Sequence, residues 1–287
     1  MLADAIRSEA YRFGKNRMTV FWSLLFIPVL FAIGGVIYHL VTKARTAEMA
    51  TKLNLPATMG LEPVNLAGDL MNGAGAAANG AILVFMLVAA ATLYAGDYRW
   101  ETWRLITARN SRINLVLGKL ITFALLAVVA MVLFMVAGIL FGVSQAIVFE
   151  RPLSFSFEAG EPGKIALLVG LSWVRIIQYA MVALLTAAIT RSLLATLFVP
   201  VVLGFAQSLI GGPGLPLLGW APTDWAAQLT LPGLAFDTLK AAVMAEPAAP
   251  PAPDGLALKA AVSLTLWTLV PLALALAWFQ RQDLSKE

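Results

Sequence analysis

Six runs of apolar residues constrain this chain more than any other feature of its sequence. A helix that crosses the hydrocarbon layer of a bilayer needs about 20 consecutive, mostly apolar residues. The runs that approach or exceed this length are 18–41, 81–96, 115–142, 164–189, 193–210 and 258–279. We therefore predict an all-α integral membrane protein with six transmembrane helices in a single domain that covers residues 1–287.

Composition supports lipid as the solvent of this chain. Of its 287 residues, 60% are hydrophobic and only 13% are charged, and the mean hydropathy is +0.83. A soluble core of this length cannot bury so much apolar side chain. The chain has no cysteine, which excludes a disulfide framework, a Cys-ligated zinc site and a thiol nucleophile.

Residues 1–17 have the pattern of an amphipathic helix. One helical face carries Leu2, Ala5, Ile6, Ala10 and Phe13, and the other carries most of Asp4, Arg7, Ser8, Arg12 and Lys15. We interpret 1–17 as a cytoplasmic interfacial helix that lies along the membrane before the first span; the alternative is an ordinary basic flank of that span. The first span is too long for a secretory signal, so we expect it to remain in the mature protein.

Two connecting segments carry further helical signals. Residues 65–79 are compatible with a helix that extends the second span or dips back into the bilayer. Residues 211–257 hold Gly/Pro clusters around moderately apolar stretches, and we expect an irregular outer loop with one or two short helices. The three-residue connection Thr190-Arg191-Ser192 predicts that spans four and five are antiparallel neighbours.

The basic residues predict that both termini face the cytoplasm. Cytoplasmic segments carry an excess of Lys and Arg. With the N-terminus inside, the short inner segments hold Arg7, Arg12, Lys15, Arg17, Arg99, Arg104, Arg109, Arg112, Arg191, Arg281 and Lys286. The pI is near 9.5, but these residues flank the apolar runs and form no long basic tract, so we expect no nucleic-acid partner.

The sequence contains no recognisable site for covalent catalysis, for ion coupling through a buried carboxylate or for nucleotide binding. The one histidine, His39, falls at the outer end of the first span, where an interfacial polar role is more common than ligation. Every Asp and Glu falls outside the predicted spans or at their edge, so coupling through a buried carboxylate has little support. The string from Gly160 to Lys164 lacks the spacing of a phosphate-binding loop. We expect no enzyme activity, no metal site and no cofactor in this chain; if ATP supplies the energy, a separate subunit binds it.

Residues 97–114, between spans two and three, carry the most informative motif. Read as one helix, the segment places Asp97, Glu101, Arg104 and Ala108 on one face and Trp100 and Trp103 on another. One of the two faces suits lipid headgroups and the other suits a protein partner. The alternative from spacing alone is a solvated connector with an aromatic belt.

The order of residues in this segment resembles the first cytoplasmic loop of ABC-2-type permeases, the membrane subunits of ATP-binding-cassette exporters. The matching residues are Asp97, Thr102, Arg104, Ser111, Arg112, Gly118 and Lys119. The six spans, the basic N-terminus and Pro222-Thr223-Asp224-Trp225 before the last span extend the resemblance to the whole permease domain. The chain departs from the family pattern at Asp97, where Glu is common, and at Glu101, where Gly is common.

The resemblance implies that 97–114 is a coupling loop whose short helix rests in a groove of a cytoplasmic ABC ATPase. The expected coupling residues are Asp97, Trp100, Glu101, Thr102, Trp103 and Arg104. It also implies that a second permease copy, identical or similar, pairs with this one and that ATP and Mg²⁺ are held by the ATPase partner. Arg104 suits an acidic groove, whereas Arg99, Arg109 and Arg112 suit anionic membrane lipids; Lys119 is a basic residue of the family motif.

Arg175 is the one charge near the middle of a predicted span. Its insertion into lipid costs at least about 2.5–3.5 kcal/mol, so it should face protein or water. The candidate substrate path around it consists of Trp173, Arg175, Gln178 and Tyr179, with Gln207 as a weaker member. Two interpretations remain open: Arg175 binds an anionic substrate or headgroup, or it is a structural arginine bonded to its neighbours. In span three, Gly138 and Gly142 form a Gly-x3-Gly pair that permits close helix approach.

The function that these features predict is a permease subunit of an ATP-driven exporter in the inner or cell membrane. Its expected substrate is amphipathic or lipid-like, such as a lipid, peptide or antibiotic. The alternatives are a stand-alone secondary carrier or channel without an ATPase, and a membrane scaffold without transport activity.

Overall fold

The computed structural model describes residues 2–53, 62–100, 102–107, 110–245 and 253–282. Within these residues, six helices are long and apolar enough to cross a membrane. They cover Arg17–Arg45, Gly80–Arg99, Arg112–Phe149, Glu161–Thr190, Leu193–Leu217 and Leu256–Arg281. Each overlaps one predicted apolar run, so the prediction of an all-α membrane protein with six spans is confirmed.

The six spans are built from the longer helices of the chain. The first consists of α2 (Arg17–Val20), the π-helical segment η1 (Phe21–Leu25) and the start of α3 (Phe26–Leu53). The next three are α5 (Gly80–Arg99), α7 (Arg112–Phe149) and α8 (Glu161–Thr190). The fifth contains α9 (Leu193–Leu209), the π-helical segment η2 (Ile210–Gly214) and α10 (Leu215–Leu217), and the sixth is α13 (Leu256–Arg281).

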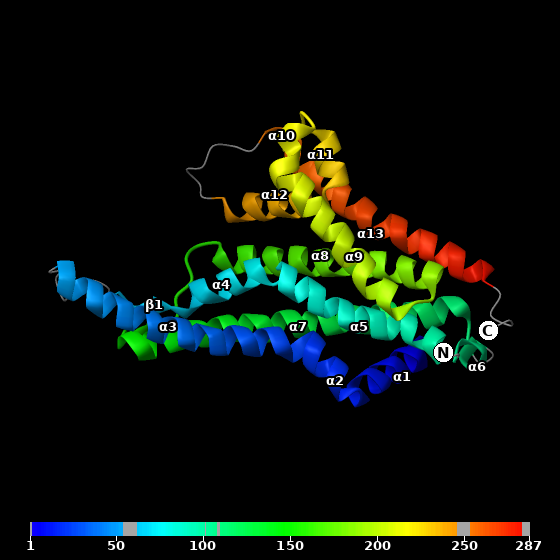
Figure 1. Ribbon diagram of the computed structural model, residues 1–287, viewed down its shortest axis with the longest axis horizontal. Coiled ribbons are helices and arrows are strands. Elements are labelled where there is room, and N and C mark those ends of the chain that lie inside the picture. The colour runs from blue at the N-terminus through cyan, green and yellow to red at the C-terminus, as the bar shows by residue number, and fades with distance from the viewer. Residues whose placement is uncertain (1, 54–61, 101, 108–109, 246–252, 283–287) are drawn as a thin grey trace.

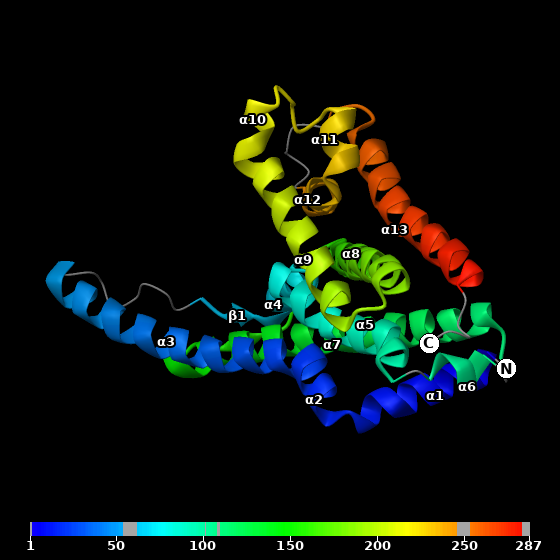
Figure 2. The ribbon, with the colours of Figure 1, turned by 45° about the vertical axis from the view of Figure 1, so that its right-hand side comes forward.

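Helix α5 occupies the centre of the bundle, and the fifth span lies at its edge. The most apolar stretch of α5 has 67% of its residues buried, whereas the most apolar stretch of the fifth span has 11% buried. Figures 1 and 2 show α5 between α7, α8 and α9, while α9 and α13 incline toward α10 and α11 and α13 packs against α8. The N-terminus, the C-terminal end of α13 and α6 (Trp103–Thr107) lie at one end of the molecule. We call this the α6 end, and the topology predicted from the basic residues places it in the cytoplasm.

Side-chain caps set where the spans begin. Asn79 accepts a hydrogen bond from the Ile82 amide at the start of α5, and Ser111 and Ser192 cap α7 and α9 in the same way. Such caps satisfy amides that a helix leaves without partners. Arg191 ends α8 with a positive φ of 55°, so the chain reverses at once into α9. The two helices are in contact, as the tight connection predicts.

The N-terminal helix α1 (Leu2–Lys15) packs on α7 through its apolar face. Ala5, Glu9 and Phe13 of α1 are buried. Gly118 permits this contact, because a Cβ atom there would lie 2.8 Å from the Ala5 Cβ. The amphipathic helix predicted for 1–17 is therefore present, and part of its apolar face is covered by protein.

The end opposite to α6 carries short elements. Helix α4 (Leu66–Ala76) precedes α5, and the short parallel strands β1 (Val64–Asn65) and β2 (Leu153–Ser154) pair beside it. Helices α10, α11 (Trp225–Thr230) and α12 (Pro232–Met244) lie between α9 and α13 in the chain. Helices α11 and α12 agree with the one or two short helices predicted within residues 211–257, whereas α10 continues the fifth span, which reaches Leu217 and not residue 210.

Helix α4 packs closely against Gly138 and Gly142 of α7. A Cβ at Gly138 would lie 3.3 Å from the Asp69 carbonyl oxygen, and one at Gly142 would overlap the Asp69 carboxylate. A Cβ added at Gly73 of α4 would lie 3.3 Å from the Met135 Cα. The Gly-x3-Gly pair thus permits close helix approach, as predicted, and the helix that approaches is α4. Burial raises the pKa of the Asp69 carboxyl group, and His39 acts in the opposite direction.

We expect Gly142→Ala to lower the free energy of unfolding by about 1–3 kcal/mol, because the added methyl group must displace a packed carboxylate. Titration with sodium dodecyl sulfate, followed by far-UV circular dichroism, measures this value. Gly170→Ala in α8 is the matched control: nothing lies within 4 Å of its Cβ position, so it should be neutral or more stable by up to about 1 kcal/mol. Asp69→Ala should restore much of the stability of Gly142→Ala, and equal stability of the two glycine variants would contradict the packing.

Candidate functional site

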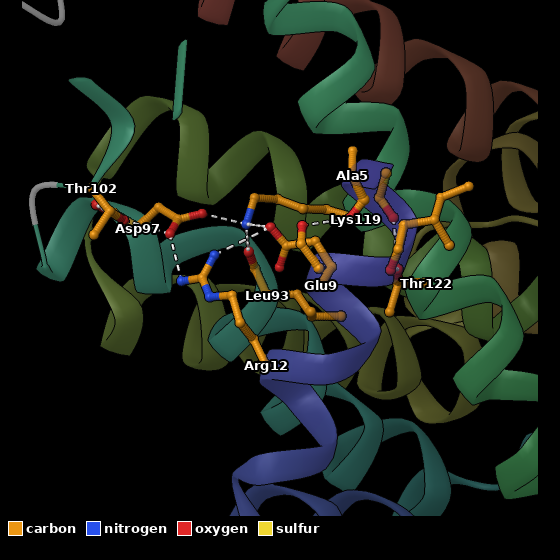
Figure 3. Close-up of polar contacts among 11 residues, drawn as sticks. Ala5, Glu9, Arg12, Leu93, Asp97, Thr102, Lys119 and Thr122 are labelled. Carbon is orange, nitrogen blue, oxygen red and sulfur yellow. Dashed lines mark hydrogen bonds and ion pairs between the residues drawn. The ribbon is translucent and has the colours of Figure 1, made fainter. Parts of the chain in front are cut away.

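A cluster of four charged side chains lies at the α6 end and joins three helices. It consists of Glu9 and Arg12 from α1, Asp97 from the last turn of α5 and Lys119 from α7 (Figure 3). We call these four residues the charge cluster. Asp97 and Lys119 were expected from the family resemblance, whereas Glu9 was not.

Lys119 lies at the centre of the charge cluster. Its Nζ forms an ion pair with Asp97 and lies 2.9 Å from Glu9 Oε1. It also donates a hydrogen bond of 2.7 Å to the Leu93 carbonyl oxygen. The Lys119 side chain is 2% exposed and that of Asp97 is fully buried. Lys119 is therefore an internal counter-ion and not a membrane-surface residue, because an unpaired charge in this position would be strongly destabilising.

Arg12 and Thr102 complete the coordination of the Asp97 carboxylate. Arg12 Nη2 lies 2.7 Å from Asp97 Oδ1, and the Thr102 hydroxyl donates a hydrogen bond of 2.6 Å to the same oxygen. Burial disfavours the charge on Arg12, but the hydrogen bond with Asp97 and the carboxylates of Asp97 and Glu9 raise the pKa of Arg12 above its ordinary value. Two acids and two bases make the charge cluster neutral, and they fasten α1 and residue 102 to the transmembrane bundle.

The chain around Trp100 and Trp103 does not form the single helix predicted for this segment. Helix α5 ends at Arg99 and α6 begins at Trp103. The prediction that Trp100 and Trp103 share one face is therefore wrong. Trp103 is buried and its ring centroid lies 4.6 Å from that of Phe279 in α13, whereas Trp100 is 69% exposed. The Lys119 ammonium lies 5.3 Å from the Trp103 ring centroid, so the charge cluster and the buried tryptophan form one unit.

Arg112 was predicted to bind anionic lipid, but in the structure its side chain binds the protein. Its Nη1 donates hydrogen bonds to the carbonyl oxygens of Phe279, Gln280 and Gln282, at 2.9, 3.1 and 2.8 Å. These carbonyls end α13, where a helix leaves acceptors without partners. Arg112 thus links the first turn of α7 to the end of the last span. Glu101, Arg109 and the side chain of Arg104 lie outside the described residues.

A cavity of about 790 Å³ lies among α5, α8, α9 and α12, toward the end opposite to α6. Arg175 and Tyr179 line it from α8, Gln207 from α9, and Asp237 and Lys240 from α12. Much of the remaining wall is apolar or glycine: Gly75, Ala76, Ala78, Gly80, Leu83, Val84, Val201, Gly204, Phe205, Gly211, Gly212, Leu231, Gly233, Leu234 and Phe236. A volume of this size is typical of small-molecule sites.

The structure brings most of the predicted substrate path together at this cavity. Arg175 Nη1 donates a hydrogen bond to Gln178 Oε1, and the guanidinium lies 4.8 Å from the Tyr179 ring centroid. Gln207 lines the cavity and donates to the Thr230 carbonyl oxygen at 3.2 Å. Trp173 is not brought to it: its indole donates a hydrogen bond of 3.0 Å to the Ala124 carbonyl oxygen and links α8 to α7.

Reasoning from the sequence missed Glu9, Asp237 and Lys240. Glu9 had a visible signal, because it lies four residues from both Ala5 and Phe13, on the apolar face of an amphipathic helix. A carboxylate on such a face needs a buried partner. Asp237 and Lys240 had no such signal, because the outer loop shows no pattern that places α12 against α8.

Comparison with known families agrees with this architecture. The family model described as ABC-2 family transporter protein matches residues 7–284. Neither the curated proteins nor the solved structures give a match. The matched range contains all six spans, the charge cluster and the cavity. From residue 7 to residue 284, this multi-pass membrane protein belongs to the ABC-2 family of transporter proteins.

Proposed function

We propose that this chain is the permease subunit of an ATP-driven exporter whose energy comes from a separate cytoplasmic ABC ATPase. Membership of the ABC-2 family makes the chain a transporter membrane subunit and implies association with an ATP-binding cassette subunit. The finer parts of the proposal are the outward direction, a second permease copy, ATP and Mg²⁺ on the partner, and the inner membrane as the location. The expected substrate is amphipathic or lipid-like.

One observation carries the mechanical part of the proposal: the segment that follows α5 is fastened to the bundle through the charge cluster and Trp103. A force on α6 therefore reaches α5 and α7 directly, since Thr102 and Trp103 contact Asp97 and Lys119 in these helices. The exposed Trp100 supplies an apolar contact for a partner, because exposed tryptophans are enriched among the anchors of protein interfaces.

Helix α5 connects the proposed coupling site with the cavity. Asp97 lies in its last turn, and Asn79, Gly80 and Leu83 line the cavity at its other end. A rigid helix of this length spans about 30 Å, so movement of one end moves the other. Rigid-body motion of packed helices is an established way to transmit such a change.

Arg104→Glu tests the coupling. We expect this charge reversal to reduce the stimulation of the ATPase by the permease, and transport with it, several-fold, because Arg104 is proposed to face an acidic groove of the ATPase. The measurements are ATP turnover and transport in vesicles that hold the reconstituted complex. Stability should stay the same in detergent titration. Arg17→Glu, which reverses an exposed charge outside the segment, is the matched control, and unchanged transport in Arg104→Glu would contradict the assignment.

Purification in mild detergent tests the class of protein. Co-purification with an ATPase whose turnover rises in the presence of this chain supports the proposal. Transport by the isolated chain in the absence of nucleotide supports the alternative, a secondary carrier or channel.

A further inference from the structure

The cavity beside α8 contains an excess of positive charge. Arg175 and Lys240 are its cations and Asp237 is its one acidic residue within the described part of the chain. The Arg175 residue is only 6% exposed, and no carboxylate among the described residues lies within ion-pair distance of its guanidinium. A buried guanidinium without a paired anion is unfavourable, so this cavity favours a ligand that brings a negative charge.

The guanidinium is held in one orientation at the cavity wall. Gln178 accepts a hydrogen bond from Nη1 and the Tyr179 ring stacks beside the cation. On the other side, a Cβ at Gly233 would lie 3.1 Å from Arg175 Nη2, so the glycine lets α12 approach closely. Among the described residues Gln178 is the one hydrogen-bond acceptor of this guanidinium, which leaves several N–H groups of the fork for a ligand.

Asp237 is placed to act as an internal competitor for this cation. It lines the same cavity from α12, one turn from Lys240, and interacts electrostatically with both Arg175 and Lys240. Burial raises the pKa of the Asp237 carboxyl group, whereas Arg175 and Lys240 lower it. An incoming anion therefore replaces a weak internal counter-ion that lies beyond ion-pair distance.

The remaining wall fixes the rest of the ligand. Leu83, Val84, Val201, Phe205 and Leu234 line the cavity and make no charged contact, which suits an apolar tail. We propose that the cavity binds the acidic head group of an anionic amphiphile on Arg175, with Lys240 as the second cation, with Asp237 as the internal competitor and with the tail along the apolar wall. This inference rests on the proposed transport function, of which it names the substrate class.

Binding to the isolated full-length chain tests the inference without the ATPase. The purified protein in a neutral maltoside detergent is titrated with dioctanoyl-phosphatidylglycerol and, separately, with dioctanoyl-phosphatidylcholine, and the bound species are counted by native mass spectrometry. The two probes share their tails and differ in net charge. We expect the anionic probe to bind at least about tenfold more tightly, as one charge-assisted hydrogen-bonding site provides. Equal binding of the two probes would overturn the proposal.

Three variants separate the site from general attraction. Arg175→Gln should abolish the preference for the anionic probe, and Arg175→Lys should retain part of it. Asp237→Asn should increase the affinity for the anionic probe several-fold, a gain that a misfolded protein cannot give. Arg45→Gln removes one exposed positive charge of α3 outside the cavity and should leave the preference unchanged. A preference retained in Arg175→Gln, or an unaltered affinity in Asp237→Asn, would refute the assignment.

Inorganic phosphate distinguishes an amphiphile from a free anion. Because the apolar wall contributes to binding, phosphate should compete only weakly with the anionic probe. Effective competition at equal concentration would overturn the proposal that the ligand is an amphiphile. A chain that fails to associate with an ATPase but shows this preference would refute the proposed function alone. The reverse result would refute the substrate class alone.

Discussion

Lys119→Met should be among the most destabilising substitutions in the chain, with a loss of about 3–5 kcal/mol in the free energy of unfolding. The change leaves Asp97 and Glu9 buried with Arg12 as their only described cation. Arg12 is half-exposed and reaches the cluster from one side, so it cannot replace an ammonium at the centre. Detergent titration followed by circular dichroism measures the loss.

A second variant distinguishes charge from shape at this position. Asp97→Asn combined with Lys119→Gln leaves Glu9 and Arg12 as a matched pair, so the double variant should be more stable than Lys119→Met. The effects of Asp97→Asn and Lys119→Gln on the free energy of unfolding should be strongly non-additive. Lys15→Met in α1, where the side chain is exposed, is the control and should change stability by less than about 0.5 kcal/mol. Equal losses in Lys119→Met and Lys15→Met would show that the charge cluster does not hold α1 on the bundle.

Trp103→Ala is expected to have an effect of similar size, about 3–5 kcal/mol, because it removes a large buried side chain. Trp103 is 2% exposed and packs between Tyr98 and Phe279, at ring distances of 5.5 and 4.6 Å. A small cavity of about 20 Å³ already adjoins it, so the substitution enlarges an existing void. The unfolding midpoint in detergent, followed by circular dichroism, measures the change.

Trp100→Ala is the matched control for this prediction, because it removes the same side chain three residues earlier, where 69% of the residue is exposed. Its stability should change by about 0.5 kcal/mol or less. Trp103→Phe should retain most of the stability, since the Trp103 Nε1 has no hydrogen-bond partner among the described residues. Comparable losses in Trp100→Ala and Trp103→Ala would contradict the division of the two tryptophans between surface and core.

The two sets of substitutions together separate two tasks within a short piece of chain. Asp97, Thr102 and Trp103 secure the segment to α1, α7 and α13. Trp100 remains available to a partner. A coupling element needs both properties, because a partner can move the bundle only through a contact that does not yield.

The length and composition of the apolar runs were sufficient to predict the six spans. The reason is physical: backbone groups in hydrocarbon must bond within their own segment, so a long apolar run has almost no alternative to a helix. The apolar runs placed the starts of α5, α7 and α9 within a few residues, whereas the capping roles of Asn79, Ser111 and Ser192 came from the structure. The same constraint does not act outside the bilayer, and there the prediction of one helix after Asp97 was wrong.

The hydrophobic pattern of the sequence could not predict which distant segments contact one another. Gly142 showed that a helix approaches α7, but the sequence named no partner, and the partner is α4. Arg175 had to avoid lipid, yet its surroundings came from α12, which follows it by about 60 residues in the chain.

The sequence by itself determined that this protein spans a membrane six times and which apolar run belongs to each span, because hydrophobic length is a local property. Its motifs also identified the segment between spans two and three. Only the tertiary structure decided that Lys119 neutralises Asp97 and Glu9, that Trp103 is buried while Trp100 is not, and that Arg175, Asp237 and Lys240 line one cavity. Those outcomes depend on which charges and surfaces meet across the bundle, and pairing in a medium of low dielectric constant is set by position in space and not by order along the chain.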